Sequence, residues 1–327
     1  MRARKRVCGV VALVVACVLA GCREEAEGPI YSVPVDEPEA TELTYELKTT
    51  IVSGLAKLNG IAVDGEGRLY AVGVGGVRVL DAEGKLVEQW ARSEAVQCVA
   101  VGSDGMVYLG SAGLISKLDK DGKEVASWDR TGSGGEKLGL ITSLAVRGID
   151  LLAADFEGKC VHRFTIDGDY SNVIGTVDAE NGSEGLRAPS PHLECAFDSA
   201  GDAVVTNPGR LRVETYGLDG TFKGCWGRAG MEAEGFCGCC NPTDIAITSK
   251  GYVVTAEKGI FRVKVYEVVD GTGRMLSFIS PRHFSKKAAG LDVAVGEGDD
   301  IYVADPGDGT IRVFRLKESP VEAGEKR

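Results

Sequence analysis

The chain has 327 residues, of which 44% are hydrophobic, and it carries 37 basic against 48 acidic side chains, a formal net charge of −11. This balance excludes nucleic acid and anionic lipid as partners bound mainly by charge, because both require a basic surface. The apolar share is enough for a sizeable core, and the 45 glycines suit a fold with many tight turns.

The N-terminus has the features of an export and anchoring signal. Basic residues within 2–6 precede an apolar stretch, 7–20, that is too short for a comfortable membrane span. Leu19-Ala20-Gly21 then place small residues directly before Cys22. This order resembles the lipobox of bacterial lipoproteins, which implies cleavage after residue 21 and a lipid on Cys22. The alternatives are an uncleaved anchor or an ordinary secretory signal. Cleavage would leave 33 basic against 48 acidic residues, a net charge of −15.

The composition divides the rest of the chain into three parts. Residues 22–40 are rich in Glu and Pro and are predicted to form a flexible acidic tether. Residues 41–317 contain the repeats described next and are predicted to form one domain. The polar residues 318–327 are predicted to be a disordered tail.

Six related copies fill the predicted domain, each with a short apolar strand, a Gly or Asp turn, a second apolar strand and a third strand. A repeat of about 40–50 residues built from four short strands is typical of a β-propeller blade. The sequence therefore predicts an all-β fold: a six-bladed β-propeller of four-stranded antiparallel blades. The copies begin near Ile61, Val99, Leu144, Cys195, Ile245 and Val293.

The sixth copy ends after its third strand, near residue 316, so its outer strand is missing from the C-terminal end. Residues 42–51 alternate between apolar and polar side chains, as a strand with one buried face does. We expect this N-terminal strand to pair with the last blade and close the ring, which would remove an exposed sheet edge. The alternative is a free hairpin or a linker.

The repeats resemble those of the NHL family. The closest copies are Leu58–Asp64, Ile301–Asp305 and Ile311–Phe314, and the resemblance covers residues 57–316. It implies a propeller, but NHL propellers include scaffolds, RNA binders, a lyase and sensor domains. The segments 236–242 and 257–266 further resemble a pattern, F-C-G-C-C-N-P followed by an E-K-G strand, in bacterial NHL-repeat proteins of unassigned role.

Candidate ligand-binding residues occupy the position just before each inner strand. Alternation along a strand places this position on the same face as small alanines, which suits the crowded axis of a propeller. Converging carboxylates there would bind a cation or a polar ligand. The alternative is that the acids accept hydrogen bonds from backbone amides. The polar members of the column are Cys98, Ser143, Glu194, Asp244 and Asp292.

A second column pairs the end of each second strand with a position on the third. Acid or amide side chains recur there with Arg in copies four to six, which indicates a structural ion-pair lattice. The pairs are Asn207 with Arg212, Glu257 with Arg262, and Asp305 with Arg312; copy three has Asp155 with His162. Glu257 and Lys258 follow the unusual segment 235–242, so these two and Asn241 are also candidate ligand-binding residues.

Seven cysteines remain beyond the signal and Cys22, and three of them, Cys237, Cys239 and Cys240, lie within four positions. One explanation is structural, with Cys225 and Cys237 as the disulfide candidates. A second is a thiolate site in which Cys237, Cys239 and Cys240 bind a transition metal such as zinc or copper, although C-x-C-C lacks the C-x₂-C spacing of common zinc sites. A third is redox chemistry of adjacent thiols.

No motif of a hydrolase, a zinc protease or a nucleotide-binding loop is present, and no catalytic residue is assigned. We expect a lipid-anchored membrane protein of the bacterial cell envelope, facing the periplasm or the exterior. It would serve as a module that binds a protein or a small molecule and not nucleic acid. The alternative is an envelope enzyme, dependent on a metal or on redox chemistry, that uses the cysteine segment and the channel carboxylates.

Overall fold

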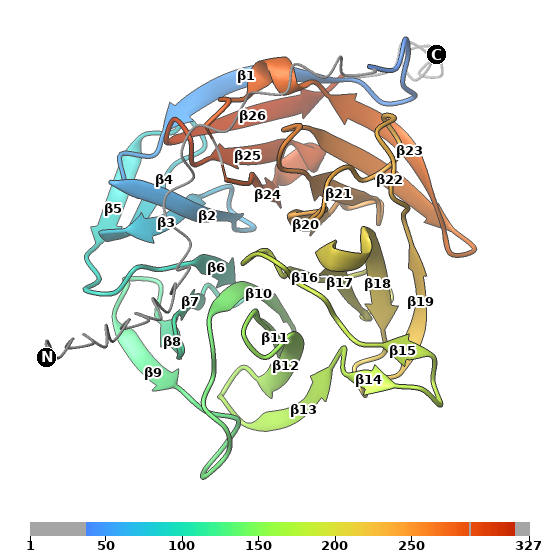
Figure 1. Cartoon of the computed structure of the whole chain (residues 1–327). Helices are drawn as coiled ribbons and strands as arrows, with labels where there is room; N and C mark the ends of the chain where they lie inside the picture. The colour runs from blue at the N-terminus through green and yellow to red at the C-terminus, as the bar shows by residue number, and fades with distance from the viewer. Residues whose placement is uncertain (1–36, 288, 318–327) are drawn as a thin grey trace, which may run out of the picture. The chain divides into compact units, whose positions relative to one another are not determined.

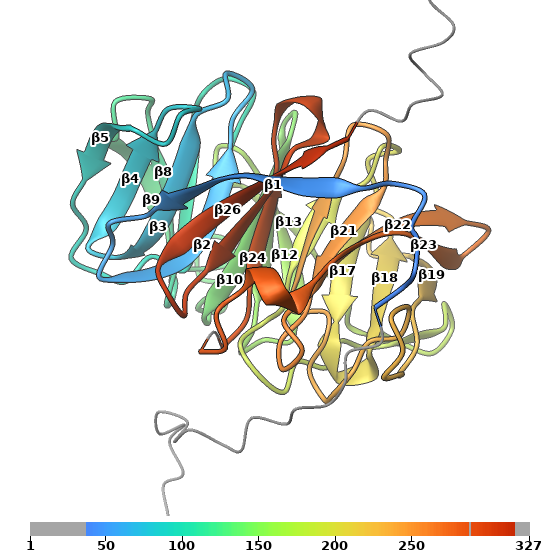
Figure 2. The same ribbon diagram turned by 90° about the horizontal axis from the view of Figure 1, so that it is seen from above.

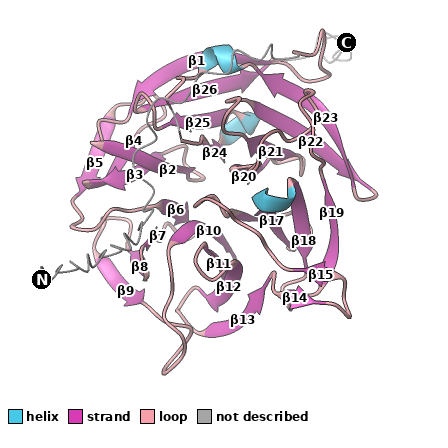
Figure 3. Cartoon of the chain, in the orientation of Figure 1, coloured by secondary structure: helices cyan, strands magenta, loops and turns pink. Residues whose placement is uncertain are grey.

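The computed structural model describes residues 37–287 and 289–317. Six four-stranded antiparallel sheets stand around a central axis, which confirms the all-β six-bladed propeller (Figures 1 and 3). The predictions for the signal, for Cys22, for most of the tether and for the tail lie outside the described residues. Within the described part, no helix is both long and apolar enough to cross a membrane.

Each blade runs from an inner strand at the axis to an outer strand at the rim. In this order the first three blades are β2 (Lys57–Val63), β3 (Leu69–Val74), β4 (Gly76–Leu80), β5 (Leu86–Trp90); β6 (Cys98–Val101), β7 (Val107–Ser111), β8 (Leu114–Leu118), β9 (Glu124–Trp128); and β10 (Ile141–Arg147), β11 (Asp150–Asp155), β12 (Cys160–Thr165), β13 (Tyr170–Ile174).

The second half of the ring repeats the arrangement, and its last blade takes its outer strand from the N-terminus. Its blades are β16 (Cys195–Phe197), β17 (Ala203–Asn207), β18 (Arg212–Tyr216), β19 (Phe222–Trp226); β20 (Asp244–Ile247), β21 (Val253–Ala256), β22 (Val263–Val269), β23 (Thr272–Ile279); and β24 (Asp292–Val295), β25 (Ile301–Asp305), β26 (Thr310–Leu316), β1 (Tyr45–Val52). The minor elements are β14 (Val177–Asp178), β15 (Ser183–Glu184) and the 3₁₀ helices η1 (Pro208–Arg210), η2 (Pro281–His283) and η3 (Glu297–Asp299).

The hydrophobic core lies between the blades. Six clusters of buried side chains each join one blade to the next, because both faces of a blade are apolar and each faces a neighbour. Between blades four and five, for example, Trp226 packs with Phe236 of the linker and Tyr266 of β22. No blade buries its faces alone, so the ring is stable only as a whole.

The two ends of the described chain meet in the sixth blade. Strand β1 pairs antiparallel with β26, with Tyr45 opposite Leu316 and Ile51 opposite Ile311 (Figure 2). The strand begins three residues later than the expected start at residue 42. Ahead of it, the amide of Leu43 donates to the carbonyl of Leu276 in blade five at 2.9 Å. Glu37 accepts a hydrogen bond from Ser280 Oγ at 2.8 Å, so the end of the predicted tether contacts the propeller.

Candidate functional site

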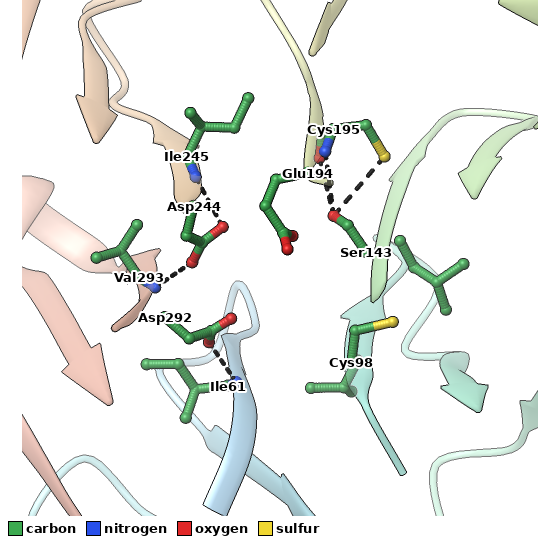
Figure 4. A pocket seen from close by; sticks show the side chains of 11 residues that line it. Ile61, Cys98, Ser143, Glu194, Cys195, Asp244, Ile245, Asp292 and Val293 are labelled. Atoms are coloured by element: carbon green, nitrogen blue, oxygen red, sulfur yellow. Dashed lines mark hydrogen bonds between the residues drawn. The ribbon is translucent and has the colours of Figure 1, made fainter. Parts of the chain in front are cut away.

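The inner strands surround a cavity of about 70 Å³ on the propeller axis (Figure 4). All five polar side chains of the first predicted column line it, which brings together residues from five different blades. They are Cys98, Ser143, Glu194, Asp244 and Asp292; apolar residues and Cys195 complete the lining. A cavity of this volume has room for water, a single ion or the tip of one side chain, and not for a whole organic molecule.

Two of the three carboxyl groups tie neighbouring blades together. Asp244 accepts hydrogen bonds from the amide of Ile245, at 2.7 Å, and from the amide of Val293 in the next blade. Asp292 accepts one from the amide of Ile61 in the first blade at 2.7 Å. For these two residues the geometry matches the alternative expectation, acids that satisfy backbone amides at the strand starts. Their side chains hold the ring closed around its axis.

Glu194 is positioned differently. Its carboxyl group extends into the cavity and accepts no hydrogen bond from a backbone amide of the described residues (Figure 4). Burial and the nearby Asp292 raise its pKa well above the ordinary value, against the opposing effect of hydrogen bonds with Ser143 and Asp244. Glu194 is therefore the acid of the cluster whose oxygens are not committed to the backbone.

The whole cluster favours protonated carboxyl groups. Burial raises the pKa of Asp292 to about 7, and burial with the neighbouring acids raises that of Asp244 well above its ordinary value. Three acids this close share protons, so a cation entering the cavity would have to displace them. The thiols stay neutral as well, because burial raises the pKa of Cys195 to about 12 and that of Cys98 well above its usual range.

The cysteine segment lies between blades four and five and does not line this cavity. Cys239 is exposed and Cys240 is buried, and their sulfur atoms lie 3.2 Å apart. Cys237 is buried, and its amide donates to Glu257 Oε2 at 3.2 Å. The disulfide of Cys225 with Cys237 stays a prediction: both are free thiols in this structure, and Cys225 lies on β19 opposite Glu214.

Of the remaining candidate ligand-binding residues, two make their contacts inside the protein. Asn241 is buried and holds the segment in place: its amide nitrogen donates to the carbonyl of Cys237, at 2.6 Å, and to that of Lys258, at 3.0 Å. Glu257 is fully buried, 2.8 Å from Arg262 Nε and 2.7 Å from Lys264 Nζ. The hydrogen-bonding groups of Asn241 and Glu257 are thus used inside the protein. Of the three candidates, only Lys258 is partly exposed.

Lys258 belongs to a polar group, the polar rim, with two residues that precede Glu194 along the chain. Its ammonium donates to Ser190 Oγ at 3.0 Å, and Ser190 stands four residues before Glu194. Burial, with Lys258 nearby, lowers the pKa of His192 to about 4, so its imidazole is neutral at physiological pH. This rim, composed of Ser190, His192 and Lys258, carries one positive charge beside the acidic cavity.

The second column needs a correction of register. The strand position that Arg312 occupies in blade six, opposite Val303, belongs to Glu214 in blade four and to Lys264 in blade five. Arg212 and Arg262 stand two residues earlier, at the position that Thr310 occupies in blade six, because the turns of blades four to six have the same length. Arg262 and Arg312 do pair with Glu257 and Asp305, whereas Arg212 pairs with Glu214 and not with Asn207. In blade three His162 lies 3.4 Å from Asp155.

Among residues 37–287 and 289–317, no group of three or more His, Cys, Asp or Glu side chains is arranged to hold a metal ion. The metal assignment to Cys237, Cys239 and Cys240 stays a prediction. Sequence reasoning also did not find a second and larger cavity, of about 640 Å³, beside blade three. It depends on a linker whose path the repeat pattern does not specify.

No family model matches the chain, and no curated protein matches it. Among solved structures it is similar to a streptogramin B lyase, at 13% identity and a TM-score of 0.53 over 84% of this chain and 97% of that one. The virginiamycin B lyase of Staphylococcus aureus gives 12% and 0.55, over 84% and 100%. The WD40 propeller domain of Doa1 gives 13% and 0.55, over 85% and 98%. At these identities the likeness shows the fold alone, a β-propeller.

Proposed function

We propose that the protein is an NHL-type binding module of the bacterial cell envelope, anchored by a lipid on Cys22. The propeller scaffold supports binding as its role, and the order of basic, apolar and small residues before Cys22 supports the anchor. In this proposal the partner is a protein that inserts a basic side chain into the axial cavity. The body of the partner would dock on the polar rim formed by Ser190, His192 and Lys258.

The observation that carries the proposal is the carboxyl group of Glu194. Asp244 and Asp292 accept hydrogen bonds from the next blade, whereas Glu194 extends into the cavity without one. A Lys ammonium fits the volume and would form charge-assisted hydrogen bonds with the acids after they release a proton. Binding would therefore strengthen as the pH rises through neutrality.

The docking part of the proposal is tested by crosslinking in cells. A photo-crosslinking amino acid at exposed Pro191, three residues before Glu194, should yield a discrete adduct that Glu194→Gln abolishes. The same amino acid at exposed Val268, on β22 away from the rim, is the matched control. Adducts of equal yield with and without Glu194→Gln would refute a partner at the axis, provided the variant melts like the wild type.

The anchor is tested separately by metabolic labelling with a fatty acid. The Cys22→Ala variant should lose all label and leave the membrane fraction. Equal labelling of the wild type and the variant would refute the lipoprotein assignment. This experiment is independent of the partner, so either half of the proposal can fail without the other.

A redox role is a second candidate, favoured by the 3.2 Å separation of the Cys239 and Cys240 sulfur atoms. An electron acceptor such as diamide would take two electrons as the two thiols lose their protons and form one S–S bond. Mass spectrometry should then find the peptide containing both residues lighter by two hydrogens. If diamide leaves that peptide reduced while Cys239 remains reactive to alkylation, the redox candidate fails. The related metal candidate is tested by the metal content of the purified protein.

A further inference from the structure

A cavity of about 640 Å³ lies beside blade three, and none of its lining residues belongs to the axial site. It is lined by the linker that joins β9 to β10 and by the outer half of the third blade. Its volume falls in the range of pockets that enclose small organic ligands. Its lining combines residues of the linker with residues from the ends of β11 and β12 and from β13: Thr131, Glu136, Lys137, Leu138, Gly139, Asp155, Glu157, Gly158, Cys160, His162, Tyr170, Val173 and Thr176.

Blade three differs from blades five and six at a position that lines the cavity. In blades five and six the strand position opposite Thr255 and Val303 carries Lys264 and Arg312, whose long side chains reach the acid at the end of the second strand. Blade three has His162 at this position, opposite Ala153. The shorter imidazole still approaches Asp155, at 3.4 Å, but leaves the space beyond it unfilled.

The walls of the cavity are held by the backbone. The amides of Gly139 and Gly158 donate to the two oxygens of Asp155 at 2.7 and 2.8 Å. The amide of Phe156 donates to the carbonyl of Leu140 at 2.9 Å, which fixes the linker to blade three. Burial alone would raise the pKa of Asp155. Its hydrogen bonds with His162, Gly158 and Gly139 lower the pKa by more than burial raises it, so the pKa lies below its ordinary value. The carboxylate is thus a fixed part of a preformed pocket.

The lining suits binding and not covalent chemistry. Burial, with Asp155 and Glu136 nearby, raises the pKa of Cys160 to about 12, so its thiol is a poor nucleophile at neutral pH. His162 Nδ1 is buried and has no hydrogen-bond partner among the described residues. An orphaned buried nitrogen in a pocket wall indicates a hydrogen-bonding group that the protein itself does not supply.

The charge of the lining is negative. Three carboxylates, those of Glu136, Asp155 and Glu157, face a single lysine, Lys137. The neighbouring Lys159 offsets part of this charge, because its ammonium interacts with Asp155 and Glu157 while it lies over the Phe156 ring and donates to the carbonyl of Ala188 at 2.8 Å. Glu136 and Glu157 are exposed at the rim and keep their charge available.

We propose that this cavity binds a small organic cation, an amine carried on an apolar body. The ammonium would pair with Glu136 and Glu157 at the rim, where its charge is only partly desolvated. The body would lie against the Tyr170 ring, Leu138 and Val173, and an aromatic ring attracts a cation as well as an apolar surface. This inference rests on blade three alone and does not depend on the axial partner or on the lipid anchor.

The test uses the full chain purified in detergent and three matched probes: benzylamine, benzyl alcohol and benzoate. Titration calorimetry should show saturable binding of benzylamine and at least about tenfold weaker binding of the alcohol and the acid, the loss expected for a missing charge-assisted contact. His162→Arg, which installs the residue of blade six, should fill the cavity and abolish binding. Glu136→Gln with Glu157→Gln should weaken it about tenfold, and exposed Asp121→Asn should change nothing.

Three results would overturn the proposal. One is the absence of saturable binding for benzylamine and for its longer homologue phenethylamine. Another is equal binding of benzoate and benzylamine. The third is benzylamine binding that the double Gln variant leaves unchanged. The double variant alters only exposed side chains, so the test stands even where His162→Arg fails to fold.

Discussion

Asp292 Oδ1 accepts a hydrogen bond from the backbone amide of Ile61 at 2.7 Å, although the two residues are 231 positions apart. This contact joins the sixth blade to the first at the axis. At the rim, the sixth blade takes β1 from the N-terminal side as its outer strand. The ring is therefore closed twice: near the axis by the side chain of Asp292, and at the outer edge by strand β1.

Replacing Asp292 should change how stability depends on pH. Burial raises its pKa to about 7 in the folded protein, against about 4 in an unfolded chain. The folded state therefore binds the proton more tightly, and the stabilisation present below pH 4 is lost as the pH rises through 7. Asp292→Asn keeps an oxygen for the Ile61 amide but does not ionise. Between pH 5 and 8 the variant should lose on the order of 2 kcal/mol less stability than the wild type.

Urea unfolding at several pH values measures this difference, with Asp121→Asn as the control for an exposed acid. The control should follow the wild-type curve. Glu194 and Asp244 remain in the variant, so part of the pH dependence persists. Parallel curves for Asp292→Asn and the wild type would contradict the raised pKa.

Adjacent residues of β1 should differ sharply in their contribution to stability. Ile51 is 5% exposed and packs in the core between blades six and one, whereas Val52 is 72% exposed. Ile51→Ala should cost about 3 kcal/mol through lost burial and a residual cavity. Val52→Ala should stay within about 0.5 kcal/mol of the wild type. Thermal unfolding of both variants decides it, and equal melting temperatures would mean that β1 does not contribute to closure in solution.

The buried acid of blade five should be essential for folding. Glu257→Gln leaves Arg262 and Lys264 as fully buried cations without a counter-charge, which should cost about 3–5 kcal/mol. The matched control is Glu267→Gln, which breaks a half-exposed pair with Arg274 and should cost less than about 1 kcal/mol. Denaturant unfolding compares the two. Similar losses would show that the cluster is screened by solvent.

Thiol reactivity should follow exposure. Cys239 is exposed, while Cys98 and Cys195 are buried and have raised pKa values, so iodoacetamide should modify Cys239 first. The hydrogen bond with Cys240 raises the pKa of Cys239, and Cys240→Ala should therefore speed its alkylation severalfold. Peptide mass spectrometry over time follows each thiol. Modification of Cys98 as early as Cys239 would contradict the burial described here.

The propeller and its axial cavity could be predicted from sequence because both depend on local periodicity. Each copy alternates independently, so one column, from Cys98 to Asp292, is enough to place five side chains on the axis. The register of the second column failed at Arg212 and Arg262, because these arginines stand two positions earlier than Arg312 although the turns have the same length. A shift of two residues does not change which face a side chain occupies, so alternation alone does not reveal it.

The cavity beside blade three could not be predicted from the sequence, and the reason is a different one. His162 was visible as the odd member of its column, but a short side chain leaves a space only where the surrounding chain does not collapse into it. That depends on hydrogen bonds such as the one from Gly139 to Asp155, between a linker and a strand end. The cysteine segment shows the same limit. Its spacing left several pairings open, because the spacing of cysteines does not fix which of them meet in the fold.

The pairing of β1 with β26 has a consequence for biosynthesis. A ribosome makes residues 45–52 long before their partners, residues 310–316. Until then the early strand presents an unpaired backbone edge and the side chain of Ile51 to whatever surrounds it. A product of premature termination could not complete the sixth sheet, and it would keep this edge open to proteases. An exposed strand edge therefore marks an unfinished chain, whereas the finished chain has this edge paired.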